Sequence, residues 1–169
     1  MASALHAKIC MTAVFVDTNV LIYSEDGASA EKQARANAWL AVLWQRRLGR
    51  VSTQVLNEFY VNVTRKAKPP MPSGDARAEV RRYQRWQPWA IDHATVETAW
   101  SVESRFGFSY WDAMIIAAAQ AQGCRYLLSE DMQHGQQVDS VQILNPFVVG
   151  PEILDTDPSV PPVLTVQEP

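Results

Sequence analysis

Four acidic residues, Asp17, Glu58, Asp112 and Asp131, stand where their carboxylates can form a common site. Two carboxylates about 4 Å apart repel each other by about 4 kcal/mol at an effective dielectric constant near 20, so a gathered set persists when a divalent cation neutralises it. Oxygen ligands without cysteine or paired histidine favour Mg²⁺ or Mn²⁺. Such an ion lowers the pKa of a bound water and stabilises charge on a phosphate group. The four residues therefore predict a magnesium-type site for phosphate chemistry.

Two of these acids follow expected strands. Asp17 comes directly after the apolar run 13–16 (AVFV), and Asp131 stands three residues beyond the expected strand 126–128. In a doubly wound sheet, ligands bind outside the carboxyl ends of the strands. Taken singly, each residue is better explained as a turn or cap, because aspartate is common where strands end.

Asp112 lies in the first turn of an expected helix at 109–122, directly before the apolar run 113–119. A helix that is apolar nearly all round is a buried helix. The helix dipole alone would stabilise the carboxylate, which is the structural explanation. The neighbours Trp111 and Ala113 indicate an apolar setting, however, and a dipole role does not require one. This setting favours a functional role.

Glu58 belongs to a polar line on the expected helix 54–67. Gln54, Glu58 and Asn62 are spaced four residues apart and lie beside the apolar stripe of that helix. By itself, such a line is better explained as a solvated flank, although the edge of the buried face is also where a cleft would begin.

The elements that position these acids alternate between short strands and helices. Strands are expected at 13–16, 50–52, 89–91, 126–128 and 141–144, and helices at 28–48 (ended by Gly49), 54–67, 75–85, 92–106 and 109–122. Strands of three to five residues separated by helices imply crossover connections and a parallel sheet covered on both faces. The fold class is therefore α/β.

The chain has 169 residues, which fits one domain of ordinary size. Residues 1–10 are expected to be a loose extension, with Met11 an alternative start to Met1, and residues 11–150 form the domain. Half of the ten prolines lie in 151–169, which we expect to be a disordered tail.

The bulk charge of −3 gives no general attraction to nucleic acid, so local basic groups would have to hold such a substrate. Arg81 and Arg82, in a basic stretch at 65–85, are candidates for this, although a solvated helix face explains them equally well. Two cysteines outside any metal-binding pattern argue against zinc and favour a reducing, cytoplasmic compartment. No apolar run approaches the roughly 20 residues of a membrane span.

Four strings occur in an order and spacing that resemble the PIN-domain family, especially its VapC-type toxins. They are VFVDTNVLIY (14–23), VSTQVLNEFY (51–60), SYWDAMIIAAAQAQGC (109–124) and YLLSEDMQHG (126–135). The resemblance runs from about residue 14 to 146. It implies a three-layer α/β/α sandwich with a five-stranded parallel sheet. It also implies cleavage of RNA that depends on Mg²⁺ or Mn²⁺, a cognate antitoxin protein and a homodimer.

Carried over residue by residue, the resemblance places Asp17, Glu58, Asp112 and Asp131 at the family's acidic ligand positions. Asn19 and Ser129 take supporting positions within the site. The last acidic position varies most in such proteins, and the spacing favours Asp131 over its neighbour Glu130.

Two other functions remain open at this point. A phosphatase of the haloacid-dehalogenase type also places an aspartate after its first strand, but it needs a second aspartate two residues later, where this chain has Asn19. A non-catalytic scaffold of the same fold that binds RNA or protein is the third hypothesis. The complete set of four acids argues against it.

Overall fold

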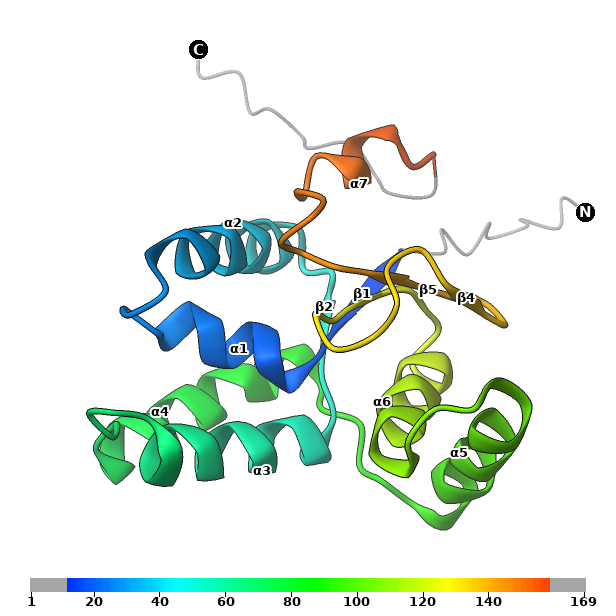
Figure 1. The fold of residues 1–169 in the computed structure, drawn as a ribbon, viewed down its shortest axis with the longest axis horizontal. Helices are drawn as coiled ribbons and strands as arrows, with labels where there is room; N and C mark the ends of the chain where they lie inside the picture. The colour runs from blue at the N-terminus through cyan, green and yellow to red at the C-terminus, as the bar shows by residue number, and fades with distance from the viewer. Residues whose placement is uncertain (1–11, 159–169) are drawn as a thin grey trace, which may run out of the picture.

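The computed structural model describes residues 12–158, which form one sheet of five strands covered by helices (Figure 1). The strands are β1 (Ala13–Val16), β2 (Gly49–Arg50), β3 (Cys124–Leu128), β4 (Gln137–Val138) and β5 (Val141–Leu144), in the order β2-β1-β3-β5-β4. The first four strands of this order are parallel, and β4 pairs antiparallel with β5 at the edge. The predicted α/β class is confirmed.

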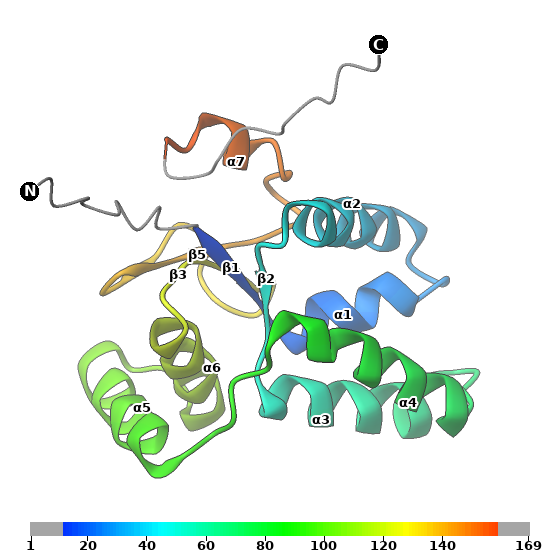
Figure 2. The same ribbon diagram turned by 180° about the vertical axis from the view of Figure 1, so that it is seen from behind.

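Helices lie on both sides of this sheet. They are α1 (Thr18–Glu25), α2 (Ala30–Arg46), α3 (Thr53–Val61), α4 (Ser73–Arg82), α5 (His93–Phe106), α6 (Tyr110–Ala121) and α7 (Ile153–Thr156). A π-helical turn at Asn62–Lys66 continues α3, and a 3-10 turn at Tyr83–Trp86 follows α4. Figures 1 and 2 show α2 and α7 on one side of the sheet, α5 and α6 on the other, and α1 between α2 and α3. The result is the expected three-layer arrangement.

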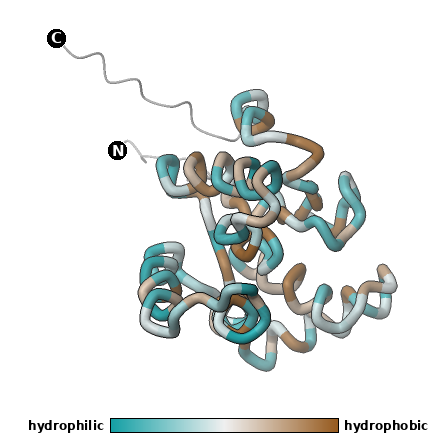
Figure 3. The backbone as a smooth tube through the Cα atoms, turned by 60° about the vertical axis from the view of Figure 1, so that its left-hand side comes forward, coloured by the Kyte–Doolittle hydropathy of each residue, from teal (hydrophilic) through white to brown (hydrophobic). Residues whose placement is uncertain are grey.

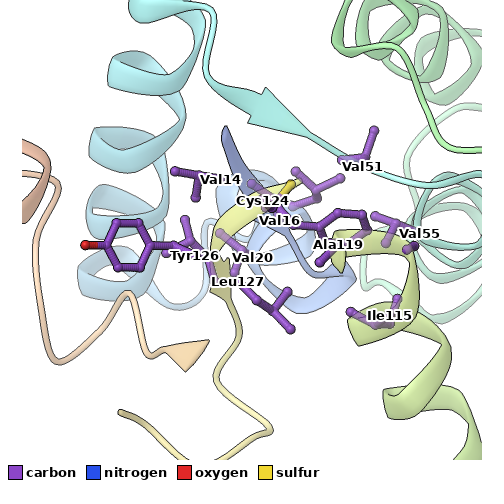
Figure 4. Packing of buried hydrophobic residues seen from close by; sticks show 14 of the residues in the cluster. Val14, Val16, Val20, Val51, Val55, Ile115, Ala119, Cys124, Tyr126 and Leu127 are labelled. Carbon is purple, nitrogen blue, oxygen red and sulfur yellow. The ribbon is translucent and has the colours of Figure 1, made fainter. Parts of the chain in front are cut away.

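The core forms where the central strands meet α6. Every residue of β1 is buried, and so is every residue from Ala113 to Ala119 of α6, as the apolar run predicts. Figure 4 shows Ile115 and Ala119 on the α6 side of this cluster and Val16 of β1 within it. Hydrophilic residues recur along the turns of the outer helices (Figure 3). This packing holds the carboxyl ends of β1 and β3 in fixed positions.

The prediction of a strand at 89–91 is wrong. Trp89 makes a single parallel bridge to Ser52, with its N–H donating to the Val51 carbonyl at 2.9 Å. The pairing ends there because the chain turns into α3 at Thr53, whose N–H donates to the Trp89 carbonyl. The fifth strand is instead β4, a strand of two residues whose length leaves no alternation to detect.

The first helical region also differs from expectation. The sequence predicts one helix over 28–48, whereas the structure has α1 directly after β1 and begins α2 at Ala30. Gly49 does not end α2: Arg47 takes the left-handed conformation at φ 58°, and Gly49 lies in β2. A Cβ on Gly49 would come within 2.4 Å of the Trp86 ring. The glycine is thus required by a close approach of the ring.

The packed chain extends past residue 150, where a tail was expected to begin. Leu154 of α7 is buried, and the Tyr126 hydroxyl donates to Asp157 Oδ2 at 2.6 Å. Arg125 Nε lies 2.7 Å from the same oxygen. These contacts were not foreseen because 151–158 has no hydrophobic period. The expected extension 1–10, the choice between Met1 and Met11, and the rest of the tail lie outside the described residues.

Cys124 is buried in the core, and burial raises the pKa of its thiol to about 12. Cys10 lies outside the described residues. Within residues 12–158, no helix combines the length and the apolar character that crossing a bilayer requires.

Candidate active site

The register of β1 and β3 brings the first acid to the carboxyl edge of the sheet. Val16 pairs with Leu128, and the Asp17 N–H donates to the Leu128 carbonyl at 3.0 Å. Asp17 and Ser129 are therefore the first residues beyond two neighbouring strands. The connections from β1 and β3 leave in opposite directions at this point, which is where open α/β sheets bind their ligands.

Asp17 is held by three hydrogen-bond donors. Its Oδ1 accepts from the Thr18 N–H at 2.7 Å, and its Oδ2 accepts from the Ser129 hydroxyl at 2.8 Å and from Asn19 Nδ2 at 3.1 Å. Burial raises the pKa of Asp17 to about 7, against the lowering effect of the bonds from Ser129 and Thr18, and the charges of Glu58 and Asp131 raise it further. The hydrogen bonds thus hold the carboxylate in place, while burial and the neighbouring charges disfavour its ionised form.

Asn19 and Ser129 also connect Asp17 to the last acid. The Asn19 amide donates to Asp131 Oδ2 at 3.1 Å, and the Asp131 N–H donates to the Ser129 hydroxyl at 3.2 Å. The Glu130 side chain pairs instead with Lys32 on α2. The structure therefore places Asp131, and not Glu130, beside Asp17.

Glu58 approaches from α3, whose first turn is capped by Ser52. The Thr18 hydroxyl donates to Glu58 Oε2 at 2.7 Å, and Gln54 Nε2 donates to Oε1 at 2.9 Å. Gln54, Glu58 and Asn62 all line one pocket. The polar line on this helix is therefore the edge of a cleft.

Asp112 is the third residue of α6, where Ser109 caps the helix and accepts from the Asp112 N–H at 3.2 Å. Among residues 12–158, no hydrogen bond reaches its carboxylate. The expected apolar setting exists on one side only, because Ala113 is buried while Trp111 is 63% exposed. A carboxylate without a structural partner at the mouth of a pocket is available to a ligand.

All four predicted acids line this one pocket of about 270 Å³, which we call the acid pocket. They reach it from four segments far apart in the sequence: the end of β1, α3, α6 and the loop after β3. Among residues 12–158, no three acidic, histidine or cysteine side chains are close enough to form a ready-made metal site.

The side chains of the acid pocket nevertheless suit a hard divalent cation. The candidate ligands Asp17, Glu58, Asp112 and Asp131 offer oxygen only, which is the donor set of Mg²⁺ and Mn²⁺. Burial raises the pKa of Asp17, and the charges of Glu58 and Asp131 add to that rise. A bound cation would favour the ionised carboxylate.

Sequence reasoning missed two residues that orient Glu58, namely Thr18 and Gln54. Thr18 was unremarkable in the sequence, although a hydroxyl directly after Asp17 had to lie at the same strand end. The sequence placed Gln54 in a polar line but indicated no role for it, because its donation to Glu58 depends on the rotamers of both side chains.

The two arginines considered for substrate binding lie elsewhere. Arg81 and Arg82 are exposed on α4 and line none of the pockets described here. Arg82 pairs with Glu79 at 2.8 Å and lies 4.9 Å above the Trp44 ring. A helix flank thus explains Arg82 without a substrate.

A larger pocket of about 810 Å³ adjoins the acid pocket, with Ile22 and Asn62 lining both. We call it the lysine pocket, because Lys66 and Lys68 line it. Glu25, the last residue of α1, and Asp26 after it line it as well, so its charge is mixed.

Comparison with known proteins adds a family and a fold. The family model described as the PIN domain matches residues 14–136. None of the curated proteins matches. Three solved structures are similar at low sequence identity, and the likeness therefore concerns the fold.

A toxin–antitoxin complex from Klebsiella pneumoniae is 20% identical with a TM-score of 0.56, covering 80% of this chain and 98% of that one. Mycobacterium tuberculosis VapC20, described as a Sarcin-Ricin loop cleaving toxin, is 21% identical with a TM-score of 0.55, covering 70% and 92%. VapBC2 from Rickettsia felis, bound to a DNA fragment from its promoter, is 11% identical with a TM-score of 0.53, covering 78% and 97%.

Proposed function

Because this chain belongs to the PIN domain family, we propose that its acid pocket is the active site of an endoribonuclease that depends on Mg²⁺ or Mn²⁺. One observation carries the proposal: four carboxylates from four separate segments line a single pocket at the carboxyl edge of the sheet. A fold gains no stability from gathering like charges. A site that binds a cation and a phosphate explains the arrangement.

Each residue has a distinct task in this proposal. Asp17 and Asp112 form the centre of the cation site, and Glu58 and Asp131 bind the ion directly or through water. Asn19 and Ser129 hold Asp17 and Asp131 in position through the hydrogen bonds described above. When bound, the cation supplies a water of lowered pKa and neutralises charge on the phosphate.

The reaction is hydrolysis of a phosphodiester. Water attacks phosphorus, the bond from phosphorus to the 3′ oxygen breaks, and the products carry a 5′-phosphate and a 3′-hydroxyl. The donors around Asp17 act before this step by fixing the carboxylate, so that the site does not reorganise as charge develops.

We further propose that the protein is the toxin of a toxin–antitoxin pair. The support is the similarity to a toxin–antitoxin complex, to the VapC20 toxin and to VapBC2. A cognate antitoxin would keep the nuclease inactive, and a homodimer is the expected assembly. Because its substrate is RNA, the cytoplasm is the expected place of action. A short open reading frame beside the gene, whose product co-purifies with this chain, would support the pairing.

The phosphatase alternative has less support. In place of a second aspartate, Asn19 donates to both Asp17 and Asp131, which an ionised carboxylate cannot do. Phosphate release from small phosphate esters would revive this alternative.

The test is cleavage of an RNA pool by purified protein with Mg²⁺ or Mn²⁺, and then with EDTA. We expect metal-dependent cleavage by the wild type and by the control Asp75→Asn, which changes an exposed acid on α4. Asp112→Asn should be inactive and remain folded. Equal cleavage with EDTA and with Mg²⁺, or full activity of Asp112→Asn, would contradict the proposal.

A further inference from the structure

Among residues 12–158, Trp111 is the one large aromatic residue that lines the acid pocket. Its side chain is 63% exposed, whereas Trp39 and Trp86 are almost fully buried. It is the second residue of a rigid helix and directly precedes Asp112. Gln54 Nε2 lies 3.4 Å from the Trp111 carbonyl and ties this turn to α3. A fixed, exposed indole beside a proposed cation ligand calls for an explanation by function.

A second hollow opens on this side of the acid pocket. It has a volume of about 640 Å³, and Trp111, Ile91 and Met114 give it an apolar floor. Gln54 and Asn57 also line it, and the exposed Asn57 brings a side-chain amide to it. We call it the Trp111 pocket. Trp111, Gln54 and Glu58 line both this pocket and the acid pocket, so the two are continuous.

The three pockets follow one another along the polar line of α3 and of the π-helical turn that continues it. Gln54 lies at the Trp111 pocket, Glu58 at the acid pocket, Asn62 between the acid and lysine pockets, and Lys66 at the lysine pocket. At a rise of 1.5 Å per residue, this line is about 18 Å long. A chain molecule lying along it would pass the four carboxylates at its middle.

Charge alone holds a polyanion poorly on this path. The whole chain has a net charge of −3, the acid pocket is negative, and the lysine pocket has mixed charge. Stacking on an aromatic ring does not depend on net charge, and every nucleobase has a face that can stack. An apolar floor, an exposed indole and the exposed Asn57 amide match a flat heterocycle with hydrogen-bonding edges.

We propose that the Trp111 pocket is a subsite for one unstacked base of a single-stranded RNA whose neighbouring phosphate lies in the acid pocket. The proposal rests on the proposed ribonuclease function for the identity of the polymer. Trp111 stacks on the base, and the exposed Asn57 amide faces its edge. A base within a duplex is already stacked on both sides and cannot enter, so the subsite selects single-stranded segments.

The experiment measures binding without turnover. Single-stranded 12-nucleotide RNAs, each carrying one 2-aminopurine, are titrated with protein in EDTA, and the fluorescence of each position is followed. We expect strong quenching at one position, lost in Trp111→Ala and largely kept in Trp111→Phe. The dissociation constant should rise on the order of tenfold in Trp111→Ala. Annealing the complementary strand to the RNA should abolish the quenching that the protein causes.

Two controls separate stacking from a general loss of structure. Trp100→Ala removes another exposed tryptophan, 47% exposed on α5 and facing His93, and should leave quenching and affinity unchanged. Replacing the quenched base with an abasic site should weaken binding by the same factor as Trp111→Ala. When both changes are made, the two losses of affinity should not add.

The outcomes distinguish this subsite from the function on which it rests. Quenching that depends on Trp111, without cleavage in Mg²⁺, would keep the subsite and overturn the ribonuclease. Cleavage with equal KM in the wild type and Trp111→Ala, and no such quenching, would overturn the subsite alone. Absence of RNA binding by the wild type, together with absence of cleavage in Mg²⁺, would overturn both. If Trp111→Ala instead dissolved a dimer, as measured by light scattering, with RNA binding intact, the surface would be an interface between copies and the proposal would be wrong.

Discussion

The two halves of the acid pocket are built in different ways. In the half at the sheet edge, Asp17 and Asp131 share the donors Asn19 and Ser129, and Asp17 is buried. In the half formed by helices, Glu58 accepts two side-chain hydrogen bonds, while no hydrogen bond among residues 12–158 reaches the Asp112 carboxylate.

This difference shows how a cluster of like charges can be kept in a stable fold. Carboxylates at the sheet edge are close to each other and need donors that offset their repulsion. Asp112 is carried by a rigid, buried helix, so that its backbone alone fixes its position. The sheet edge is therefore expected to respond to changes in supporting residues and in pH. The helix half is expected to respond mainly to loss of the acids themselves.

The largest effect is expected from the acids, and it ranks the two halves. Asp17→Asn and Asp112→Asn should each lower the rate of RNA cleavage by about 10³-fold or more, because both remove charge from the centre of the cation site. Asp131 is exposed, and Asp131→Asn should cost about 10- to 100-fold. Single-turnover rates at saturating Mg²⁺ measure this. Equal losses at Asp131 and Asp17 would remove the ranking.

The next effect concerns pH, and only the sheet edge should show it. Burial raises the pKa of Asp17 to about 7 in the fold, against an ordinary value of 3.8. The stability that comes from its bound proton is therefore complete below about pH 4 and is lost as the pH rises through 7. Without metal, the difference in unfolding free energy, Asp17→Asn minus wild type, should increase by up to about 4 kcal/mol as the pH rises over this range.

Thermal unfolding in EDTA from pH 5 to pH 8 measures this difference. Mg²⁺ should reduce it by stabilising the wild type at pH 8 and not Asp17→Asn. Asp75→Asn on the surface of α4 serves as the matched control and should run parallel to the wild type. A difference between Asp17→Asn and wild type that does not change with pH would show that Asp17 is ionised without penalty.

A smaller effect is expected from the supporting hydroxyls. Ser129→Ala removes a donor from Asp17 and an acceptor from the Asp131 backbone, and should lower apparent Mg²⁺ affinity by about 10- to 100-fold. Thr18→Val should cost less than about tenfold, because Glu58 keeps its bond from Gln54. Mg²⁺ titrations of cleavage rate compare the two variants. A larger loss from Thr18→Val would place the critical support on the helix side.

The smallest effect should come from the basic residues outside the acid pocket. Lys66→Ala and Lys68→Ala should each weaken RNA binding a few-fold and reduce the slope of log K against log salt by about 0.7, the value for one phosphate contact of a single strand. Arg82→Ala should leave that slope unchanged, because its guanidinium is paired with Glu79. The opposite result would bring the arginines back as substrate contacts.

Local sequence was sufficient for several elements. The run before Asp17 forms β1 as predicted, Asp92 and Ser109 cap α5 and α6, and the apolar run 113–119 is buried. These features depend on hydrogen bonds and burial within a few residues, which residue types report directly. The prediction of a strand at 89–91 was wrong because strand pairing depends on a partner that is distant in the sequence. Here only the bridge to Ser52 forms.

The sequence by itself determined which acids were candidates and which kinds of element carry them. Only the tertiary structure decided that they share a pocket, because that depends on the register of Val16 with Leu128 and on the side of the sheet taken by α3 and α6. It also decided that Trp111 is exposed while Ala113, two residues later, is buried. Residues two positions apart on a helix point in different directions, and only packing against the rest of the chain fixes which of them faces solvent.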